Sequence, residues 1–363
     1  MANRGYEPNV AIPPGETLQE YLDTRGMRQA DLAKRLGLVP KTVNEIIKGK
    51  APITPETALA LESVFGTPAR FWMSLEANYQ EGRARLERAR LIEDDCHFAE
   101  QVPYASLAKL GAVPSARRLE DKVINLRSFF GVASLKLLPT VLPAAFRRED
   151  RDTASSLALA SWLRMGELAA AKADLPRFDG KRLRSLLPFF RSLTLDSQSD
   201  DLPDRLQGMC ASCGVALAFV THLPKTYVNG ATKWLTPDRV LVQLSLRRPY
   251  ADIVWFNLFH EIGHLLLHGK REVYVSEVED DNKMSHNDAE QEADEFASEQ
   301  LVPSKAYVRF LRENRASEVS VCRFAQQIGV HPCIVVGRLQ HDGKIKFNAL
   351  NHLRPRLSWG TKQ

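Results

Sequence analysis

The first 80 residues are divided by glycine at short intervals, and this punctuation constrains the fold more than any other feature of the sequence. Periodic apolar segments end at four glycines, namely Gly26, Gly37, Gly49 and Gly66. Glycine is common just after a helix because it adopts the left-handed conformation without steric cost. Thr54-Pro55 and Thr67-Pro68 each pair an N-cap residue with a proline suited to the first helical position. We therefore predict a compact domain of roughly five short helices.

Residues 29–48, QADLAKRLGLVPKTVNEIIK, have the pattern of a helix-turn-helix. The first helix turns at Gly37, and a second helix begins near Pro40 with Val43 and Ile47 on one face. The small side chain of Ala33 lets the two helices approach closely, and Leu38 fills the corner between them. The opposite face of the second helix is then free to enter the major groove of DNA.

The N-terminal end of this second helix is where side chains reach base edges in such motifs. Lys41, Thr42 and Asn44 lie there, so we predict that they contact bases. Gln29 and Lys48 are placed to meet phosphates, which fixes register without reading sequence. The same helical hairpin also serves as a docking or dimerisation unit in other proteins, and a protein partner is the alternative interpretation.

The chain has 363 residues, which is more than one hydrophobic core usually serves, so we expect more than one domain. The pattern of apolar residues also changes along the chain. Amphipathic helical stretches continue to about residue 212, interrupted by a loop over 195–204. GVALAFV, ATKWL and RVLVQLSL are then short strand-like runs, which Pro224, Gly230 and Pro237 separate as turn residues. We predict a mainly α fold with a small β-sheet: a helix-turn-helix domain at 1–80, a helical middle region at 81–212, an α+β zincin-like domain at 213–345 and a tail at 346–363.

The sequence His260-Glu261-Ile262-Gly263-His264 is an HExxH motif within a segment of helical apolar periodicity. His260 and His264 are one turn apart on a helix, so they point to the same side, as two ligands of one tetrahedral zinc require. Glu261 can reach a water molecule at the metal as general base. The alternative is a helix with two unrelated histidines. Burying polar side chains among Leu and Phe is unfavourable unless they have a partner, and a bound metal would be that partner.

A second helix, AEQEADEFASEQLVP, supplies candidates for the third ligand. We predict that Glu290 completes the site and that Asp294, one turn further on, accepts a hydrogen bond from a ligand histidine. Glu292 is the alternative third ligand. This donor set favours Zn²⁺, and no acidic cluster suited to two magnesium ions is apparent, which argues against a DNA-processing metalloenzyme. His268 and His286 follow the motif and are interpreted as loop histidines.

Composition and cysteine usage narrow the class of protein. No stretch approaches the length of a membrane helix, the N-terminus has no apolar signal core, and five cysteines do not form a disulfide framework. We therefore expect a cytoplasmic protein with no membrane partner. Cys210-Ala211-Ser212-Cys213 is a single CxxC, and buried thiols are favoured over a redox or zinc role. The net charge of +5 is compatible with nucleic acid but does not decide the matter.

The segment from Pro14 through Tyr79 resembles the HigA-type antitoxin branch of the Xre/Cro repressors, including the tail TPARFWMSLEANY after the helix-turn-helix. The resemblance implies a homodimer that binds double-stranded operator DNA, and it makes a toxin a candidate partner.

YADIVWFNLFHEIGHLLLHG and EQEADEFASEQLVP resemble the ImmA/IrrE family of metallopeptidases, over roughly 214–343. In that family both histidines of HExxH and a downstream glutamate hold zinc, the HExxH glutamate is catalytic, and the usual substrate is a helix-turn-helix repressor. The resemblance assigns these roles to His260, His264, Glu290 and Glu261.

These features together predict a DNA-binding transcriptional regulator with a zinc-dependent peptidase domain that cleaves a repressor or another partner protein. The alternative is a non-enzymatic antitoxin that binds operator DNA and neutralises a toxin, with the metal domain acting as a sensor or scaffold.

Overall fold

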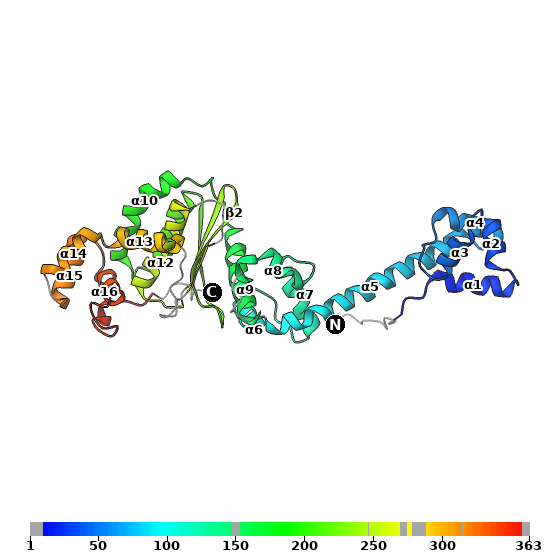
Figure 1. Cartoon of the computed structure of the whole chain (residues 1–363), viewed down its shortest axis with the longest axis horizontal. Coiled ribbons are helices and arrows are strands. Elements are labelled where there is room, and N and C mark those ends of the chain that lie inside the picture. The colour runs from blue at the N-terminus through cyan, green and yellow to red at the C-terminus, as the bar shows by residue number, and fades with distance from the viewer. Residues whose placement is uncertain are drawn as a thin grey trace. The chain divides into compact units, whose positions relative to one another are not determined.

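A computed structural model of the chain describes residues 10–146, 153–245, 247–268, 274–277, 288–313 and 316–357 (Figure 1). The chain divides into two compact units, residues 1–97 and 98–363. Helix α5, Ala69–Gln101, runs across this division. Each unit has its own architecture.

The first unit is built from four short helices, followed by most of α5. The four are α1 Pro14–Thr24, α2 Gln29–Leu36, α3 Pro40–Ile47 and α4 Pro55–Phe65. The predicted glycine punctuation is confirmed, since Gly26, Gly37, Gly49 and Gly66 all have φ between 58° and 75°. Thr54 caps α4 by accepting a hydrogen bond from the Thr57 amide. The core is made of small and apolar side chains from every helix: Leu18, Leu22, Leu32, Ala33, Val43, Ile46, Ile53, Ala58, Leu61, Phe65 and Trp72.

The predicted start of α5 at Thr67-Pro68 is wrong in its capping residue. The helix begins at Ala69, and the amide of Ala69 donates to the carboxylate of Glu62. The Thr67 hydroxyl instead donates to the hydroxyl oxygen of Tyr21 at 3.2 Å. A carboxylate from the preceding helix therefore satisfies the free amide that the threonine was expected to bind.

The second unit is mostly helical, as predicted for residues 81–212. Its helices are α6 Tyr104–Lys109, α7 Leu119–Phe130, α8 Leu138–Val141, α9 Thr153–Ala170, α10 Gly180–Ser192, α11 Leu202–Ala211, α12 Ala251–Leu267, α13 Asp288–Leu301, α14 Ser304–Glu313, α15 Glu318–Ile328 and α16 Pro332–His341. Short 3-10 turns lie at Leu135–Leu137, Pro143–Phe146, Leu193–Asp196 and Asn351–Leu353. The loop expected over 195–204 therefore contains the end of one such turn and the start of α11.

One mixed sheet, in the order β1-β3-β2-β4, lies in this unit. Its strands are β1 Val215–Val220, β2 Val228–Thr236, β3 Arg239–Ser245 and β4 Tyr274–Glu277. β1 pairs in parallel with β3, while β2 is antiparallel to both β3 and β4. The three predicted strands are confirmed. β4, which has only four residues, is not among the predicted strands.

Opposite faces of the sheet are covered by α12 and α9 (Figure 1). Alternation along β2 divides its side chains between them, because successive residues of a strand point to opposite faces. Thr232 contacts Glu261 of α12, and the ammonium group of Lys233 pairs with the carboxylate of Glu167 on α9. On β3, Gln243 donates to the main-chain oxygen of Trp162 in α9 at 2.7 Å. The sheet is thus the layer that connects the middle helices to the HExxH helix.

The hydrophobic core of the second unit joins segments from several parts of the chain. Side chains of α10 and α11 pack in the same cluster as the sheet, α12 and α16, and Leu357 near the C-terminus is also buried in it. The predicted fold class, mainly helical with one small sheet, is confirmed. The four-part domain division remains a prediction.

Among the described residues, no single helix meets the length and apolarity expected of a membrane span, while the bent pair α15 and α16 does so only when taken together.

Candidate metal centre and nucleic-acid interface

Helix α12 places three polar residues of the HExxH motif inside the protein. His260 is 5% exposed, Glu261 is fully buried and His264 is 1% exposed. Gly263, between them, allows α13 to pack closely, since a Cβ there would lie 3.1 Å from Phe296 and 3.3 Å from the Cα of Ala293. A glycine at this contact therefore lets the two helices approach until side chains from the first turn of α13 reach the histidines.

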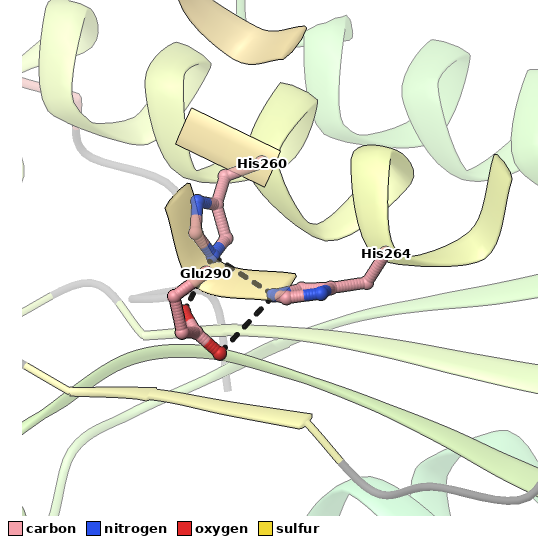
Figure 2. A group of neighbouring side chains, drawn as sticks. All are labelled: His260, His264 and Glu290. Carbon is pink, nitrogen blue, oxygen red and sulfur yellow. Dashed lines mark hydrogen bonds and ion pairs between the residues drawn. The ribbon is translucent and has the colours of Figure 1, made fainter. Parts of the chain in front are cut away.

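Three donor groups converge from the two helices, and Figure 2 shows both imidazoles directed toward the Glu290 carboxylate. The Nε2 atoms of His260 and His264 are 3.0 Å apart. The two carboxylate oxygens of Glu290 lie 3.1 Å from Nε2 of His260 and 3.4 Å from Nε2 of His264. These residues form a group whose potential ligand atoms all lie within 4.8 Å of one another.

The separations fit a tetrahedral divalent metal. Ligand bonds of about 2.0–2.1 Å at tetrahedral angles place neighbouring donor atoms about 3.3 Å apart. Two neutral imidazoles cannot satisfy each other through facing Nε2 lone pairs, and a carboxylate adds negative charge to the same space. A cation at the centre resolves this conflict, and two imidazoles with one carboxylate are a zinc-type donor set that leaves one position open.

In the absence of a metal, a proton must take the place of the cation. Burial opposes a charge on His260, but hydrogen bonds to Asp294 and Glu290 outweigh it and raise the pKa of His260 to about 10. Burial likewise opposes ionisation of Glu290, but the two histidines lower its pKa to about 2. The pocket therefore holds an anionic Glu290 and strongly attracts positive charge.

The two histidines are held in different ways. Nδ1 of His260 donates to the Asp294 carboxylate at 2.7 Å, which leaves Nε2 facing the centre. Nδ1 of His264 is buried and has no hydrogen-bond partner within the described part of the chain. Its ring is stacked on Tyr274 of β4, with centroids 4.3 Å apart and an interplanar angle of 11°. Ring packing thus orients His264, where a hydrogen bond orients His260.

The Glu261 carboxylate is positioned by β2. The Thr232 hydroxyl donates to Oε2 of Glu261 at 2.7 Å. A Cβ at Gly230 would lie 2.4 Å from Oε1, so only glycine leaves space for this carboxylate. The prediction that Gly230 is a turn residue is therefore wrong, because it lies within β2 and serves close packing. Thr232 and Tyr274 were not predicted, and only their place in strands beside the motif could have suggested them.

Glu292, the alternative third ligand, lies away from the donor group. Its carboxylate is 3.7 Å from Nδ1 of His268, whose other ring nitrogen lies 3.0 Å from the main-chain oxygen of Ala289. His268 is therefore engaged at the end of α12 and not free in a loop. His286 lies outside the described residues.

In the first unit, α2 and α3 form the predicted helix-turn-helix. Val43 and Ile46 are buried, and a Cβ at Gly15 of α1 would lie 2.3 Å from the main-chain oxygens of Ile46 and Ile47. This contact holds α3 against α1 by one face and leaves the other outward.

The predicted DNA-contacting residues lie on or beside this outward face. Lys41 is exposed and its ammonium group is 3.8 Å from the Glu45 carboxylate, while Thr42 and Asn44 are half-buried. Lys48 is exposed at the end of α3. Gln29 begins α2 and donates to Gln19 at 3.1 Å.

Comparison with known proteins assigns both regions. Residues 18–72 match the helix-turn-helix family, and residues 254–340 match the IrrE N-terminal-like domain of peptidase family M78. Virulence-associated protein I of Dichelobacter nodosus is 41% identical over 79 residues, which make up 22% of this chain and 73% of that protein. The chain belongs to the Xre-like helix-turn-helix regulators.

Two further comparisons concern the same N-terminal region of this regulator. The uncharacterised HTH-type transcriptional regulator YddM of Escherichia coli K12 is 33% identical and covers 17% of this chain and 67% of that protein. The solved structure of the Pseudomonas aeruginosa antitoxin HigA with the higBA promoter is 33% identical, covers 24% of this chain and 95% of that chain, and has a TM-score of 0.22. The two family matches and the curated relatives show that the chain is a helix-turn-helix DNA-binding regulator with an IrrE-like domain at its C-terminal side.

The regulator contains a second turn between helices, from α15 to α16, with similar spacing. Ala325, Gly329 and Pro332 are separated as Ala33, Gly37 and Pro40 are in the first motif. However, the residues of α16 that would correspond to an outward face are buried: Cys333, Ile334, Val336 and Gln340. This helix belongs to the core of the second unit, and α3 is the better candidate for DNA contact.

The cysteine pair of the regulator lies in the hydrophobic core. Cys210 and Cys213 are buried and not bonded as a disulfide. Burial raises the pKa of both thiols, which keeps them protonated and unreactive. Buried structural thiols, as the sequence favoured, fit this environment.

Proposed function

We propose that this regulator binds operator DNA through α3 and hydrolyses a peptide bond of a partner protein at the His260, His264 and Glu290 site. The observation that supports the peptidase activity is the convergence of these three donor groups, from two helices, beside the buried carboxylate of Glu261. The match to an M78 peptidase domain over the same residues agrees with this chemistry.

His260, His264 and Glu290 would hold the metal, for which Zn²⁺ fits the donor set. When bound, zinc supplies a Lewis acid that polarises a carbonyl group and makes water more acidic. Asp294 and Tyr274 keep the two imidazoles oriented toward the centre. Glu261 lies between the two ligand histidines in the HExxH motif, so it is the general base that takes a proton from the attacking water. The Thr232 hydroxyl keeps the Glu261 carboxylate in place.

The partner is a protein with an exposed loop, and a helix-turn-helix repressor or a toxin are the two candidates. Metal analysis and a cleavage assay on candidates from the neighbouring genes test the proposal. We expect about one zinc per chain, lost in His260→Ala and kept in Glu261→Gln, with cleavage lost in both. Glu292→Gln is the matched control, because that exposed carboxylate is near the site and makes no contact with the three donors; it should keep both zinc and activity.

Two outcomes would refute this assignment in different ways. A fully active protein without metal would contradict the site itself. A wild-type protein that binds zinc and a toxin, but cleaves neither the toxin nor a repressor, would instead support a non-enzymatic antitoxin whose metal domain is a scaffold or sensor.

For the DNA interface, we propose a homodimer that presents two copies of α3 to half-sites about one helical turn apart. Lys41, Thr42 and Asn44 would contact bases, and Gln29 and Lys48 would contact phosphates. Binding titrations should show relaxed sequence preference for Asn44→Ala. Lys48→Ala should weaken binding to all sequences and reduce the salt dependence by about one charge.

The control for these titrations is Lys109→Ala, which removes an exposed lysine from α6 of the other unit. It should leave affinity and salt dependence unchanged. If Lys48→Ala and Asn44→Ala behave like Lys109→Ala, then α3 is not in the groove.

A further inference from the structure

His268 ends the HExxH helix and contacts the main chain of both ligand-bearing segments. Its backbone amide donates to the main-chain oxygen of His264 at 3.2 Å, which closes the last turn of α12. Its ring nitrogen Nε2 lies 3.0 Å from the main-chain oxygen of Ala289, the residue before Glu290. A carbonyl oxygen only accepts, so Nε2 carries the hydrogen. His268 therefore links the main chain of His264 to the main chain of Ala289.

This link acts where the third donor is least constrained by its own helix. Glu290 lies in the first turn of α13, which begins at Asp288. The first turn of a helix lacks part of the hydrogen bonding that fixes interior residues, and helix ends open most easily. A further close contact of α13 with α12 is at Ala293, beside Gly263, one turn along from Ala289. The hydrogen bond at Ala289 therefore fixes the part of α13 that carries the carboxylate.

The surroundings of His268 favour this role over that of an additional ligand. One ring nitrogen is engaged by Ala289 and the other faces the Glu292 carboxylate at 3.7 Å. The ring centroid is 5.5 Å from that of Tyr274, which in turn stacks on His264. The side chain is only 10% exposed, so the hydrogen bond is shielded from water.

We propose that His268 is a positioning residue that holds Glu290 at the distance needed to complete the metal site. The inference rests on the proposed function, since it concerns the third ligand of the same centre. Its ring also lies beside that of His264, with centroids 5.3 Å apart, but its hydrogen bond reaches Glu290 through the main chain of α13.

The test is zinc affinity of the full chain, measured by competition with a chromophoric chelator, together with the Co²⁺ absorption spectrum of each variant. His268→Phe keeps a ring in place but removes the donor, and we expect the zinc dissociation constant to rise about tenfold, as for other residues that orient ligands. The Co²⁺ spectrum should change as Glu290 leaves the coordination shell. His268→Gln keeps an N–H at similar reach and should stay within about threefold of wild type.

His352→Ala is the matched control, because His352 is an exposed histidine that also pairs with a glutamate, Glu318, at 3.2 Å. It should change neither affinity nor spectrum. If His268→Phe does not fold, His268→Asn takes its place, since its amide is too short to reach Ala289. Each variant is also melted without metal, because a purely structural role would lower stability and leave zinc affinity unchanged.

Equal zinc affinity and equal Co²⁺ spectra in wild type and His268→Phe would overturn this inference while leaving the metal site intact. A wild-type chain that binds no zinc would overturn the proposed function, and the role of His268 with it.

Discussion

The buried ion pair between Asp252 and Arg354 is the strongest test of how the HExxH helix is held. Asp252 lies in the first turn of α12, and Arg354 lies near the C-terminus, in the segment predicted to be a tail. Nε of Arg354 is 3.0 Å from both carboxylate oxygens, and Nη2 is 2.7 Å from one of them. Nη1 also donates to Gln340 of α16 at 2.8 Å. The Arg354 side chain is only 11% exposed and the Asp252 side chain only 7%.

Arg354→Leu removes one partner and leaves the Asp252 carboxylate buried without its cation. Loss of one member of a buried pair costs about 3–5 kcal/mol, because the remaining charge is desolvated and uncompensated. Arg205→Leu is the control, since Arg205 pairs with Asp196 at 3.2 Å on the surface of the same unit and its loss should cost about 1 kcal/mol or less. The expected difference between the two variants is therefore at least about 2 kcal/mol.

The pH dependence of this variant has a definite sign. Burial raises the pKa of Asp252, although the Arg354 guanidinium opposes the shift. A carboxyl group with a raised pKa in the folded state destabilises the fold above that pKa, and the penalty is relieved as protonation neutralises it. Without Arg354 the pKa of Asp252 should rise further. The destabilisation should therefore become smaller as the pH falls from about 8 to about 5.

Urea unfolding of the full chain, followed by circular dichroism at both pH values, measures this effect. Asp252→Asn combined with Arg354→Leu should recover part of the loss, because no buried charge remains. If Arg354→Leu is no more destabilising than Arg205→Leu, or if its effect grows as the pH falls, the reasoning from burial is wrong.

The remaining predictions concern two glycines and one histidine. Gly230→Ala should keep zinc but abolish cleavage, because its Cβ would displace the Glu261 carboxylate; metal content and a cleavage assay check this. Gly15→Ala should destabilise the first unit by about 3 kcal/mol, since its Cβ would overlap main-chain oxygens of α3, whereas Gly208→Ala meets open space and should be neutral or slightly stabilising in the same thermal melts. The metal-free chain should lose stability with rising pH, because folding raises the pKa of His260 from 6.5 to about 10. The stability that protonated His260 contributes is complete below pH 6.5 and is lost as the pH rises through about 10. Thermal melts in the presence of a chelator measure this loss.

Local signals in the sequence were sufficient for most of the helices, for three of the four strands and for the two motifs. Glycine with positive φ, threonine and proline at helix starts, and apolar periodicity all act within a few residues, so they can be interpreted without knowing the fold. The i, i+4 spacing of His260 and His264 is local in the same sense, because it depends only on helix geometry. The spacing of Glu290 and Asp294 on a second helix is local in the same way, and in the structure the Glu290 carboxylate lies 3.1 Å from Nε2 of His260.

The contacts that hold the site together depended on the tertiary structure, because they join residues far apart in sequence. Thr232 reaches Glu261 across 29 positions and Arg354 reaches Asp252 across 102. Tyr274 lies in a strand too short to show a period, and Gly230 has the same sequence signature as a turn glycine. The role of such residues depends on which part of the fold packs against them. A sequence pattern shows the periodicity of a segment but does not show which segment it contacts. The sequence therefore determined which groups can do chemistry, and the packing of α12 against the sheet, α13 and the C-terminal segment decided which residues hold those groups in place.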